Sequence, residues 1–293
     1  LLFYLNYFFD PLIQLSFNYD LLRSAGSSMK KVFSILDESP VLSNTGTISP
    51  EMNTDNVIEF KNVDFSYGRE KVLHDVSFQI SKGEKIAIVG ETGAGKSTIA
   101  KLILRFYLPT EGQVMYYNEP STSVSQKWAR KNIAYVPQES FLFRGSIKEN
   151  LIYSNPTKIQ LEKELEDIGI LDWFNRYEDG LQHDVGERGG NVSAGERQFI
   201  ALLRAVLAKR EIIVFDEATA NLDIETENSI LEATERILLN QTSVVIAHRL
   251  ETILNAQKIL VMQDGKLLGF DNHKNLLLEN ETYKELFSAW DLA

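Results

Sequence analysis

Two hydrophobic patterns alternate along most of the chain. Short apolar runs at 85–89, 211–215 and 242–247 are too brief for helices and are rich in Val and Ile, so they predict buried strands. The first run is followed, after a short polar loop, by IAKLILRF, in which the apolar residues have helical periodicity. Strands that alternate with helices are typical of an α/β fold built around a parallel sheet.

Other stretches predict parts that surround this core. Residues 257–263 and 266–270 predict a hairpin, because Asp264 and Gly265 between them favour a tight turn. Residues 146–208 predict a mostly helical subdomain, and the C-terminal HKNLLLENETYKELFSAW predicts two short helices. The chain also contains strand-like stretches that predict an antiparallel β-subdomain beside the α/β core. These stretches lie near 57–67, 76–80 and 113–117.

The first 36 residues have a pattern of their own. Apolar residues recur mostly at three- and four-residue steps from Leu12 to Leu36, as on one face of a helix. The opening LLFYLNYFF has neither a basic segment nor a cleavage site, so it is not a signal peptide. Asp10 and Pro11 interrupt its apolar run, so the segment is not expected to span a membrane by itself. Two interpretations stay open: an amphipathic core helix, or the cytoplasmic end of a longer membrane helix.

The domain boundaries follow from composition. Residues 37–56 are rich in Ser, Thr, Asn, Pro and acidic residues, which is typical of a linker. The sequence therefore predicts a helical segment at 1–36, a linker at 37–56 and a folded domain at 57–293.

Composition excludes several classes of protein. The chain has 293 residues and a net charge of −11, and it contains no Lys/Arg block, so a protein that grips nucleic acid by its phosphates is not expected. It has no cysteine, which excludes a disulfide scaffold, a thiol nucleophile and a Cys-ligated metal site.

The strand at 85–89 leads into GETGAGKST at 90–98, a pattern that predicts a triphosphate site. Its three glycines allow successive N–H groups to point into one concavity, and the helix that follows adds about half a positive charge at its N-terminus. Lys96 is expected to reach the β- and γ-phosphates, and the Ser97 hydroxyl to ligate Mg²⁺. The predicted nucleotide-binding residues of this loop are Gly90, Glu91, Thr92, Gly93, Ala94, Gly95, Lys96, Ser97 and Thr98.

Two later strands end in polar residues. Asp216 and Glu217 follow IIVF, and ligands of parallel sheets collect at this end of the strands. We expect Asp216 to hold Mg²⁺ through water, and Glu217 to accept a proton from the water that attacks the γ-phosphate. His248 ends the strand at 242–247 and is a further candidate for this site.

From Val57 to Leu286 these motifs, in this order, resemble the nucleotide-binding domain of ATP-binding-cassette (ABC) transporters. The resemblance implies a P-loop ATPase fold with antiparallel β and helical subdomains, and it implies ATP hydrolysis coupled to transport. The matching motifs are Tyr67 in VDFSYG, the Walker A loop GETGAGKST, Gln138 of the Q-loop, the signature VSAGERQ at 192–198, the Walker B strand IIVFDE, the D-loop NLD at 221–223 and the switch histidine His248.

The resemblance also implies roles for these residues. Tyr67 stacks on adenine, in agreement with the use of aromatic faces as platforms for bases. Gln138 touches Mg²⁺ or the attacking water, and His248 takes part in hydrolysis. In this family two domains face head to tail, so Ser193 and Gly195 of the signature bind the ATP held by the partner domain. The expected partner is therefore a second nucleotide-binding domain.

Two stretches within the family pattern resemble exporters. SFLFRGSIKENL at 140–151 carries the aromatic pair Phe141 and Phe143, which meets the membrane domain, and VGERG at 185–189 resembles the exporter X-loop. The segment before Asp37 now resembles the cytoplasmic end of the last transmembrane helix. The implied protein is membrane-bound, has its ATPase at the cytoplasmic face and has a transmembrane domain in the same polypeptide. Drug, lipid and peptide cargo all stay open.

One motif departs from the family pattern. The usual signature reads LSGGQ, whereas this chain has VSAGE, with Ala194 and Glu196 in place of glycine and glutamine. A side chain beside a phosphate holds the ligand off, and a carboxylate beside it adds like-charge repulsion of about 1 kcal/mol or more. Two hypotheses follow: one half of a heterodimeric exporter, or a homodimer that tolerates the variant.

Two other functions are less consistent with the sequence than an exporter. A soluble ABC ATPase without a membrane part is disfavoured by the acidic charge, by the FLFRGSI stretch and by the helix before Asp37. An interaction protein that binds ATP without hydrolysing it is disfavoured by the presence of Glu217 and His248.

Overall fold

The computed structural model describes residues 2–38, 46–153, 160–216, 232–234, 236–238, 241–247 and 249–291. The chain divides into two units, Leu1–Ser43 and Asn44–Ala293, which are described separately. The predicted boundaries at 36 and 57 stay predictions.

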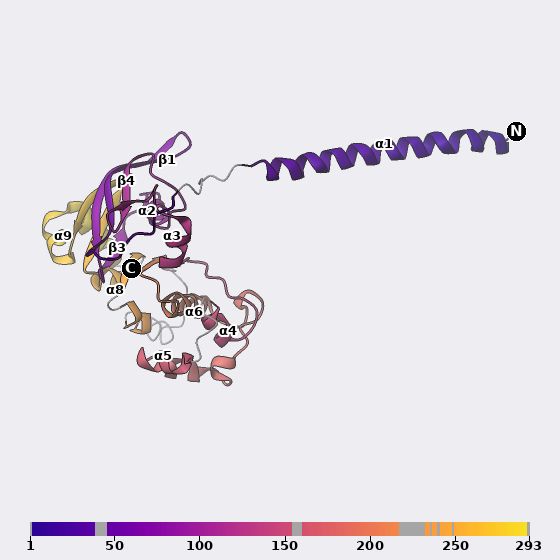
Figure 1. The fold of residues 1–293 in the computed structure, drawn as a ribbon. Coiled ribbons are helices and arrows are strands. Elements are labelled where there is room, and N and C mark those ends of the chain that lie inside the picture. Colours follow the sequence, from indigo (N-terminus) through magenta and orange to yellow (C-terminus); the bar gives the residue numbers. More distant parts are fainter. Residues whose placement is uncertain are drawn as a thin grey trace. The chain divides into compact units, whose positions relative to one another are not determined.

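The first unit contains a single described element, the helix α1 (Leu2–Leu36) (Figure 1). Pro11 lies inside it, where a proline removes one backbone hydrogen bond of the helix. In the described residues, no helix has a stretch that is long and apolar enough to cross a bilayer.

The second unit contains two β-sheets. One is an antiparallel sheet with the strand order β2-β1-β4-β5, and the other is a six-stranded sheet with the order β10-β9-β3-β8-β7-β6. The strands of the first sheet are β1 (Asn56–Tyr67), β2 (Glu70–Ser81), β4 (Glu111–Tyr116) and β5 (Glu119–Pro120). Those of the second are β3 (Lys85–Val89), β6 (Ile133–Val136), β7 (Ile212–Asp216), β8 (Thr242–Ile246), β9 (Lys258–Gln263) and β10 (Lys266–Asp271).

The six-stranded sheet explains the apolar runs of the sequence. Its strands β3 and β8 are buried along their whole length, so both faces need apolar side chains and the runs do not alternate. Five of its strands are parallel, and only β10 is antiparallel, as the return strand of the hairpin with β9. The carboxyl ends of β3, β7 and β8 therefore meet at one edge of the sheet, where ligands of such sheets bind.

Helices cover this sheet and form a separate part of the unit. The described α-helices are α2 (Lys96–Ile103), α3 (Gln126–Asn132), α4 (Ile147–Ile152), α5 (Leu161–Asp167), α6 (Ala194–Leu207), α8 (Leu250–Leu254), α9 (His273–Glu279) and α10 (Glu281–Asp291). Three 3₁₀ turns, Leu171–Arg176, Gly180–Gln182 and Glu187–Gly189, lie between α5 and α6. Figure 1 shows α4, α5 and α6 near one another, and α6 also packs on β6 and β7.

The unit has more than one hydrophobic core. Phe60, Ile86, Ile99 and Tyr116 belong to a core that joins the two sheets with α2. The helical part has its own core, in which Phe174 and Phe199 are buried. The two parts are joined by α6, because Ala201, Leu202 and Ala205 of this helix pack on β6, β7 and β8.

The predicted α/β class, the antiparallel β-subdomain and the helical part are all confirmed. The strand predicted at 76–80 is longer in the structure, because β2 begins at Glu70 and pairs back onto β1, with Glu70 opposite Tyr67. Leu73 and Val76 are both buried but lie three residues apart, because the strand is irregular at Asp75 (φ +52°), so the two-residue alternation that predicts a strand is broken there.

The turn between β9 and β10 also supports the predicted phosphate loop. Asp264 and Gly265 both have positive φ, as a tight hairpin turn requires. The Gly265 N–H donates to the Ala94 carbonyl at 3.2 Å, and the Gly265 carbonyl accepts from the His74 N–H at 2.9 Å. A Cβ at position 265 would lie 2.0 Å from the Val72 carbonyl oxygen. Only glycine fits between β2 and the loop.

We expect Gly265→Ala to destabilise the chain by more than about 2 kcal/mol, because left-handed strain of about 1–2 kcal/mol adds to a backbone clash. The matched control is Gly68→Ala, since Gly68 also has positive φ (+64°) but has no atom within 4 Å of the added Cβ. Urea unfolding of the three proteins measures both effects. Equal losses in the two variants would contradict the clash.

Candidate nucleotide-binding site

The loop between β3 and α2 is built on three glycines with positive φ. Gly90 (φ +147°) passes so close to β9 that a Cβ would lie 2.2 Å from the Met262 carbonyl oxygen. Gly95 (φ +99°) caps α2, and a Cβ there would lie 2.7 Å from Leu73 Cδ2. Gly93 (φ +89°) has open space around it, so it is needed for its backbone conformation alone. The loop is therefore fixed at both ends by neighbouring strands.

Lys96 is the first residue of α2, and its side chain lies under this loop. It is 8% exposed, and its ammonium donates to the Gly90 carbonyl at 2.6 Å and to the Glu91 carbonyl at 2.9 Å. Burial lowers the pKa of Lys96, while the charge of Asp216 acts in the opposite direction. A buried cation at a helix N-terminus makes this loop suitable for an anion.

Asp216 lies at the carboxyl end of β7 and faces α2. Together with Ser97 and Tyr135 it lines a small hollow of about 70 Å³. The Gln198 amide of α6 donates to the Asp216 backbone carbonyl at 2.7 Å, which fixes the end of the strand. A hydroxyl and a carboxylate are the oxygen ligands that Mg²⁺ uses beside nucleotide phosphates, so this donor set fits that ion.

The predicted metal ligand Gln138 is not part of this hollow. It lies two residues after β6, is exposed, and is absent from the residues that line the space around Ser97 and Asp216. In this structure Ser97 and Asp216 therefore come together without Gln138.

Tyr67, the predicted adenine platform, ends β1 beside α2. Its ring makes edge-to-face contacts with Phe65 and Tyr107, with centroids 4.8 and 5.2 Å away. The Lys101 ammonium of α2 lies 5.3 Å from the ring centroid. An aromatic cluster next to the phosphate loop is a suitable surface for a base.

The signature begins α6 with a capping box. The Ser193 hydroxyl accepts from the Glu196 N–H at 3.2 Å, and the Glu196 carboxylate accepts from the Ser193 N–H at 2.8 Å. Arg176 lies 3.9 Å from the other carboxylate oxygen and covers the Trp173 ring at 4.0 Å. Gly195 is buried within the first turn. The carboxylate predicted to repel a phosphate is thus held by the helix N-terminus and has a cation nearby.

Three predicted features lie outside the described residues: Glu217, His248 and the D-loop at 221–223. Their described neighbours are Asp216, the last residue of β7, and Ala247, which directly follows β8. The proposed roles of Glu217 and His248 therefore rest on the sequence.

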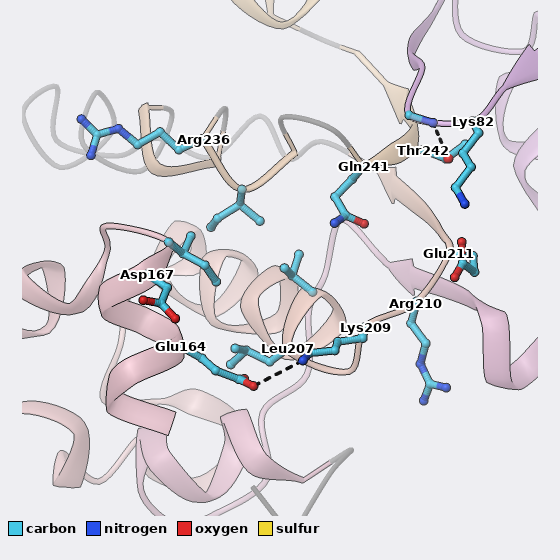
Figure 2. A pocket seen from close by; sticks show the side chains of 14 residues that line it. Lys82, Glu164, Asp167, Leu207, Lys209, Arg210, Glu211, Arg236, Gln241 and Thr242 are labelled. Atoms are coloured by element: carbon cyan, nitrogen blue, oxygen red, sulfur yellow. Dashed lines mark hydrogen bonds and ion pairs between the residues drawn. The ribbon is translucent and has the colours of Figure 1, made fainter. Parts of the chain in front are cut away.

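A larger cleft, of about 710 Å³, lies at the other edge of the sheet (Figure 2). It is lined by residues that precede or begin strands, such as Glu211 and Thr242, and by α5. Two of its cations are engaged: Lys209 pairs with Glu164 at 3.6 Å, and Arg210 donates to the Lys131 carbonyl. The Thr242 hydroxyl accepts from the Gly83 N–H at 2.9 Å. Greater volume does not make this cleft the phosphate site, because it lies at the amino ends of the strands, whereas ligands of parallel sheets bind at the carboxyl ends.

Sequence reasoning missed Tyr135, which lines the same hollow as Asp216. Tyr135 stands in β6 and Asp216 in β7, about eighty residues later, and only the strand order brings them together. The order of strands in a parallel sheet carries no local sequence signal. Arg176 was also missed, because it lies in a 3₁₀ turn and approaches Glu196 of α6 only through the packing of the two elements.

Comparison with known proteins identifies the family. The family model described as "ABC transporter" matches residues 73–220, which include the phosphate loop, Asp216 and the capped helix α6. This chain belongs to the ABC transporter family. The fold is accordingly the ABC ATPase fold.

Relatives and solved structures add detail. A putative ABC transporter ATP-binding protein of Streptococcus pneumoniae is 37% identical over 290 residues, which cover 97% of this chain and 49% of that protein. An ATP-dependent lipid A-core flippase of Xylella fastidiosa is 39% identical over 274 residues, which cover 92% and 46%. A bacterial Atm1-family ABC exporter with ATP bound superposes with a TM-score of 0.79 and 34% identity, over 96% of this chain and 50% of that one. The chain thus spans about half the length of each of these relatives.

The capping box of α6 gives a prediction for Glu196. Glutamine also closes such a box, and the partly exposed contact with Arg176 is worth little, so Glu196→Gln is expected to change the free energy of unfolding by less than about 0.5 kcal/mol. Glu196→Ala removes the partner of the Ser193 N–H and is expected to cost about 1 kcal/mol. Urea unfolding of both variants tests this. If the two substitutions cost the same, the carboxylate does not act as a cap.

Proposed function

We propose that this chain is the ATP-hydrolysing domain of an ABC exporter, in which ATP binding closes a head-to-tail pair of domains and hydrolysis reopens it. The observation that carries the proposal is the buried Lys96 ammonium inside the glycine loop, next to the Ser97 and Asp216 hollow. The likeness to an ATP-bound exporter over almost the whole chain supports it.

The loop residues from Gly90 to Thr98 would bind the phosphates. Lys96 now hydrogen-bonds two carbonyls of its own loop. The β- and γ-phosphate oxygens would take over as acceptors, because an ion pair between ammonium and phosphate is stronger than two bonds to neutral carbonyls. Tyr67 would carry the adenine on the aromatic cluster at the end of β1.

Ser97 and Asp216 would hold Mg²⁺, with Gln138 as a third ligand once nucleotide is bound. The ion supplies charge neutralisation for the phosphates. Because Gln138 lies on the segment after β6, outside the hollow, its part in the site requires that this segment approach Ser97.

Hydrolysis would use Glu217 as the base that accepts a proton from the attacking water, with His248 beside the γ-phosphate. A positioned base contributes about 10²–10⁴ in rate. Glu217 follows directly on Asp216, so the strand end that holds the metal ligand also delivers the base.

The partner would be a second nucleotide-binding domain. Ser193 and the N–H groups of α6, including that of Gly195, would bind the γ-phosphate of ATP held by the partner's loop. The Ser193 hydroxyl accepts a bond from Glu196 in the free chain, so its proton remains free to be donated to a phosphate. Two such sites per pair would make closure depend on ATP.

The transmembrane part would belong to the same polypeptide and place this domain at the cytoplasmic face of a membrane. Exporter relatives that are about twice the length of the match support this, and α1 would continue into the last membrane helix. Phe141 and Phe143 would face the membrane domain. They are 48% and 39% exposed, and Phe143 stacks on Tyr153 with centroids 4.2 Å apart.

The base is tested with Glu217→Gln, which we expect to reduce steady-state phosphate release by about 10²–10⁴ and to leave ATP binding and ATP-driven pairing intact. The matched control is Glu211→Gln, which makes the same change just before the amino end of β7, in the cleft of Figure 2. Turnover by Glu217→Gln within about tenfold of the wild type would rule out this base.

The composition of the pair is tested by expressing the full-length subunit alone in membranes and measuring its ATPase. A heterodimer predicts little turnover without a second gene product, because the VSAGE signature serves one site only. Robust and cooperative turnover would support a homodimer. The binding of Glu196 in the capping box favours the homodimer, since a carboxylate that is already engaged repels a phosphate less.

A further inference from the structure

The segment 105–110 joins α2 to β1 and contains a tyrosine, Tyr107, to which the proposed mechanism gives no part. At the far end of this segment, the Thr110 N–H donates to the Asp64 carbonyl at 2.8 Å, and the Thr110 hydroxyl accepts from the Ser66 N–H at 3.0 Å. Both partners belong to β1, the strand that ends in Tyr67. The segment therefore links the helix that follows the phosphate loop to the strand of the predicted adenine platform.

The near end of the segment is fixed by Arg105. This residue has a φ of +53°, which turns the chain out of α2, and it is only 3% exposed. Its Nε donates to the Ser121 carbonyl at 2.7 Å, so a buried side chain anchors the turn. The N–H of the next residue, Phe106, donates to the Lys101 carbonyl at 2.9 Å. Because both ends are hydrogen-bonded, the segment holds Tyr107 at a fixed place between α2 and β1.

Tyr107 contacts Tyr67 through its ring. The two rings lie edge to face, with centroids 5.2 Å apart and planes at 88°, and Phe65 contacts both of them. This is a preferred geometry of aromatic pairs, so the Tyr107 ring restricts the rotation of the Tyr67 ring. Both tyrosines are half-buried, so part of Tyr67 remains accessible to a base.

We propose that Tyr107 is a positioning residue for the nucleobase: its ring holds Tyr67 in the orientation in which Tyr67 carries adenine, at a distance from the phosphate loop that the segment 105–110 sets. This inference rests on the proposed function, because it deepens the assignment of Tyr67 as the adenine platform. Tyr107 acts through Tyr67 and does not itself touch the nucleotide.

The Tyr67 side chain depends on such a neighbour. Within the part of the chain that the structure describes, its hydroxyl has no hydrogen-bond partner, so contacts with the ring determine its orientation. A side chain that is ordered before binding does not lose rotational freedom when the ligand arrives, and this increases affinity. Of its two aromatic neighbours, Phe65 is a core residue, whereas Tyr107 is half-buried and can be replaced without opening the core.

The ring and the hydroxyl of Tyr107 are separated by two variants. Tyr107→Leu removes the ring contacts with Tyr67, whereas Tyr107→Phe keeps them and removes only the hydroxyl. The matched control is Phe270→Leu at the end of β10 that is away from the Gly265 turn. Phe270 is also half-buried, contacts the Phe78 ring with centroids 5.8 Å apart and has the Lys258 ammonium 5.2 Å from its own centroid.

The test uses the 293-residue chain and the equilibrium binding of ADP and of inorganic pyrophosphate in saturating Mg²⁺, measured by calorimetry. Pyrophosphate lacks the nucleoside, so the ratio of its dissociation constant to that of ADP reports what the nucleoside contributes. We expect Tyr107→Leu to reduce this ratio by about tenfold, because stacking on an aromatic ring contributes about fivefold to 150-fold per base and a displaced ring keeps part of it. The ratio in Tyr107→Phe and in Phe270→Leu, and the pyrophosphate affinity of every variant, are expected to stay within about twofold of the wild type.

A double mutant tests whether Tyr107 acts through Tyr67. In a Tyr67→Leu background, the further change Tyr107→Leu is expected to leave the ratio unchanged, because the ring that it positions is already absent. Equal additional losses in the presence and absence of the Tyr67 ring would overturn the positioning role, since Tyr107 would then contact the base itself.

The other outcomes distinguish this inference from the proposed function. A wild-type ratio in Tyr107→Leu would overturn the inference and leave the ATPase proposal standing. A loss in Tyr107→Phe as large as in Tyr107→Leu would also overturn it, since the hydroxyl and not the ring would then be required. Weaker pyrophosphate binding in Tyr107→Leu would overturn it too, because the segment would then act on the phosphate loop. A wild-type chain that binds neither ADP nor pyrophosphate would contradict the proposed function, and this inference with it.

Discussion

A buried ammonium must be solvated by the protein, and in this chain two carbonyls of a glycine loop do so for Lys96. This requirement fixes much of the surrounding structure. The loop must turn through three positive φ values to present its carbonyls and N–H groups to one concavity. Its two ends must lie against β9 and β2, where a Cβ on Gly90 or Gly95 would clash. The β9–β10 turn then closes over Ala94 with a glycine of its own. The strand β3 leads into the loop, and β9 and β2 pack against its two ends, so three strands fix the position of the Lys96 ammonium.

Electrostatic compensation recurs at the signature. The family pattern has an uncharged glutamine where this chain has Glu196, and a carboxylate next to a triphosphate is unfavourable in isolation. In the structure the same carboxylate satisfies the Ser193 N–H at a helix N-terminus, where negative charge is stabilising, and Arg176 stands on its other side. A substitution that reads as a defect in a motif is, in three dimensions, part of a capping box.

How much could be predicted depended on whether a feature is local. The phosphate loop and the buried strands were predicted from the sequence, because glycine spacing and apolar runs are encoded within a few residues. The strand β2 was predicted six residues short, because the irregularity at Asp75 breaks the two-residue alternation between the buried Leu73 and Val76. The shared hollow of Tyr135 and Asp216 and the approach of Arg176 to Glu196 depend on strand order and on the packing of separate elements. The roles of Glu217, His248 and the domain boundaries stay predictions from the motifs.

The long helix α6 has a mechanical consequence. Its first residue follows Ser193, which would touch the ATP of the partner domain, and one turn later Gln198 grips the strand end that carries Asp216 of the domain's own site. Within each domain of the proposed pair, α6 would thus connect the ATP held by the partner with the domain's own site. A shift of α6 caused by the partner's ATP would pull on the metal ligand of the other site. In a head-to-tail pair, the two α6 helices would link the two nucleotide sites in both directions. The loss of one nucleotide would therefore change the strain at the other site.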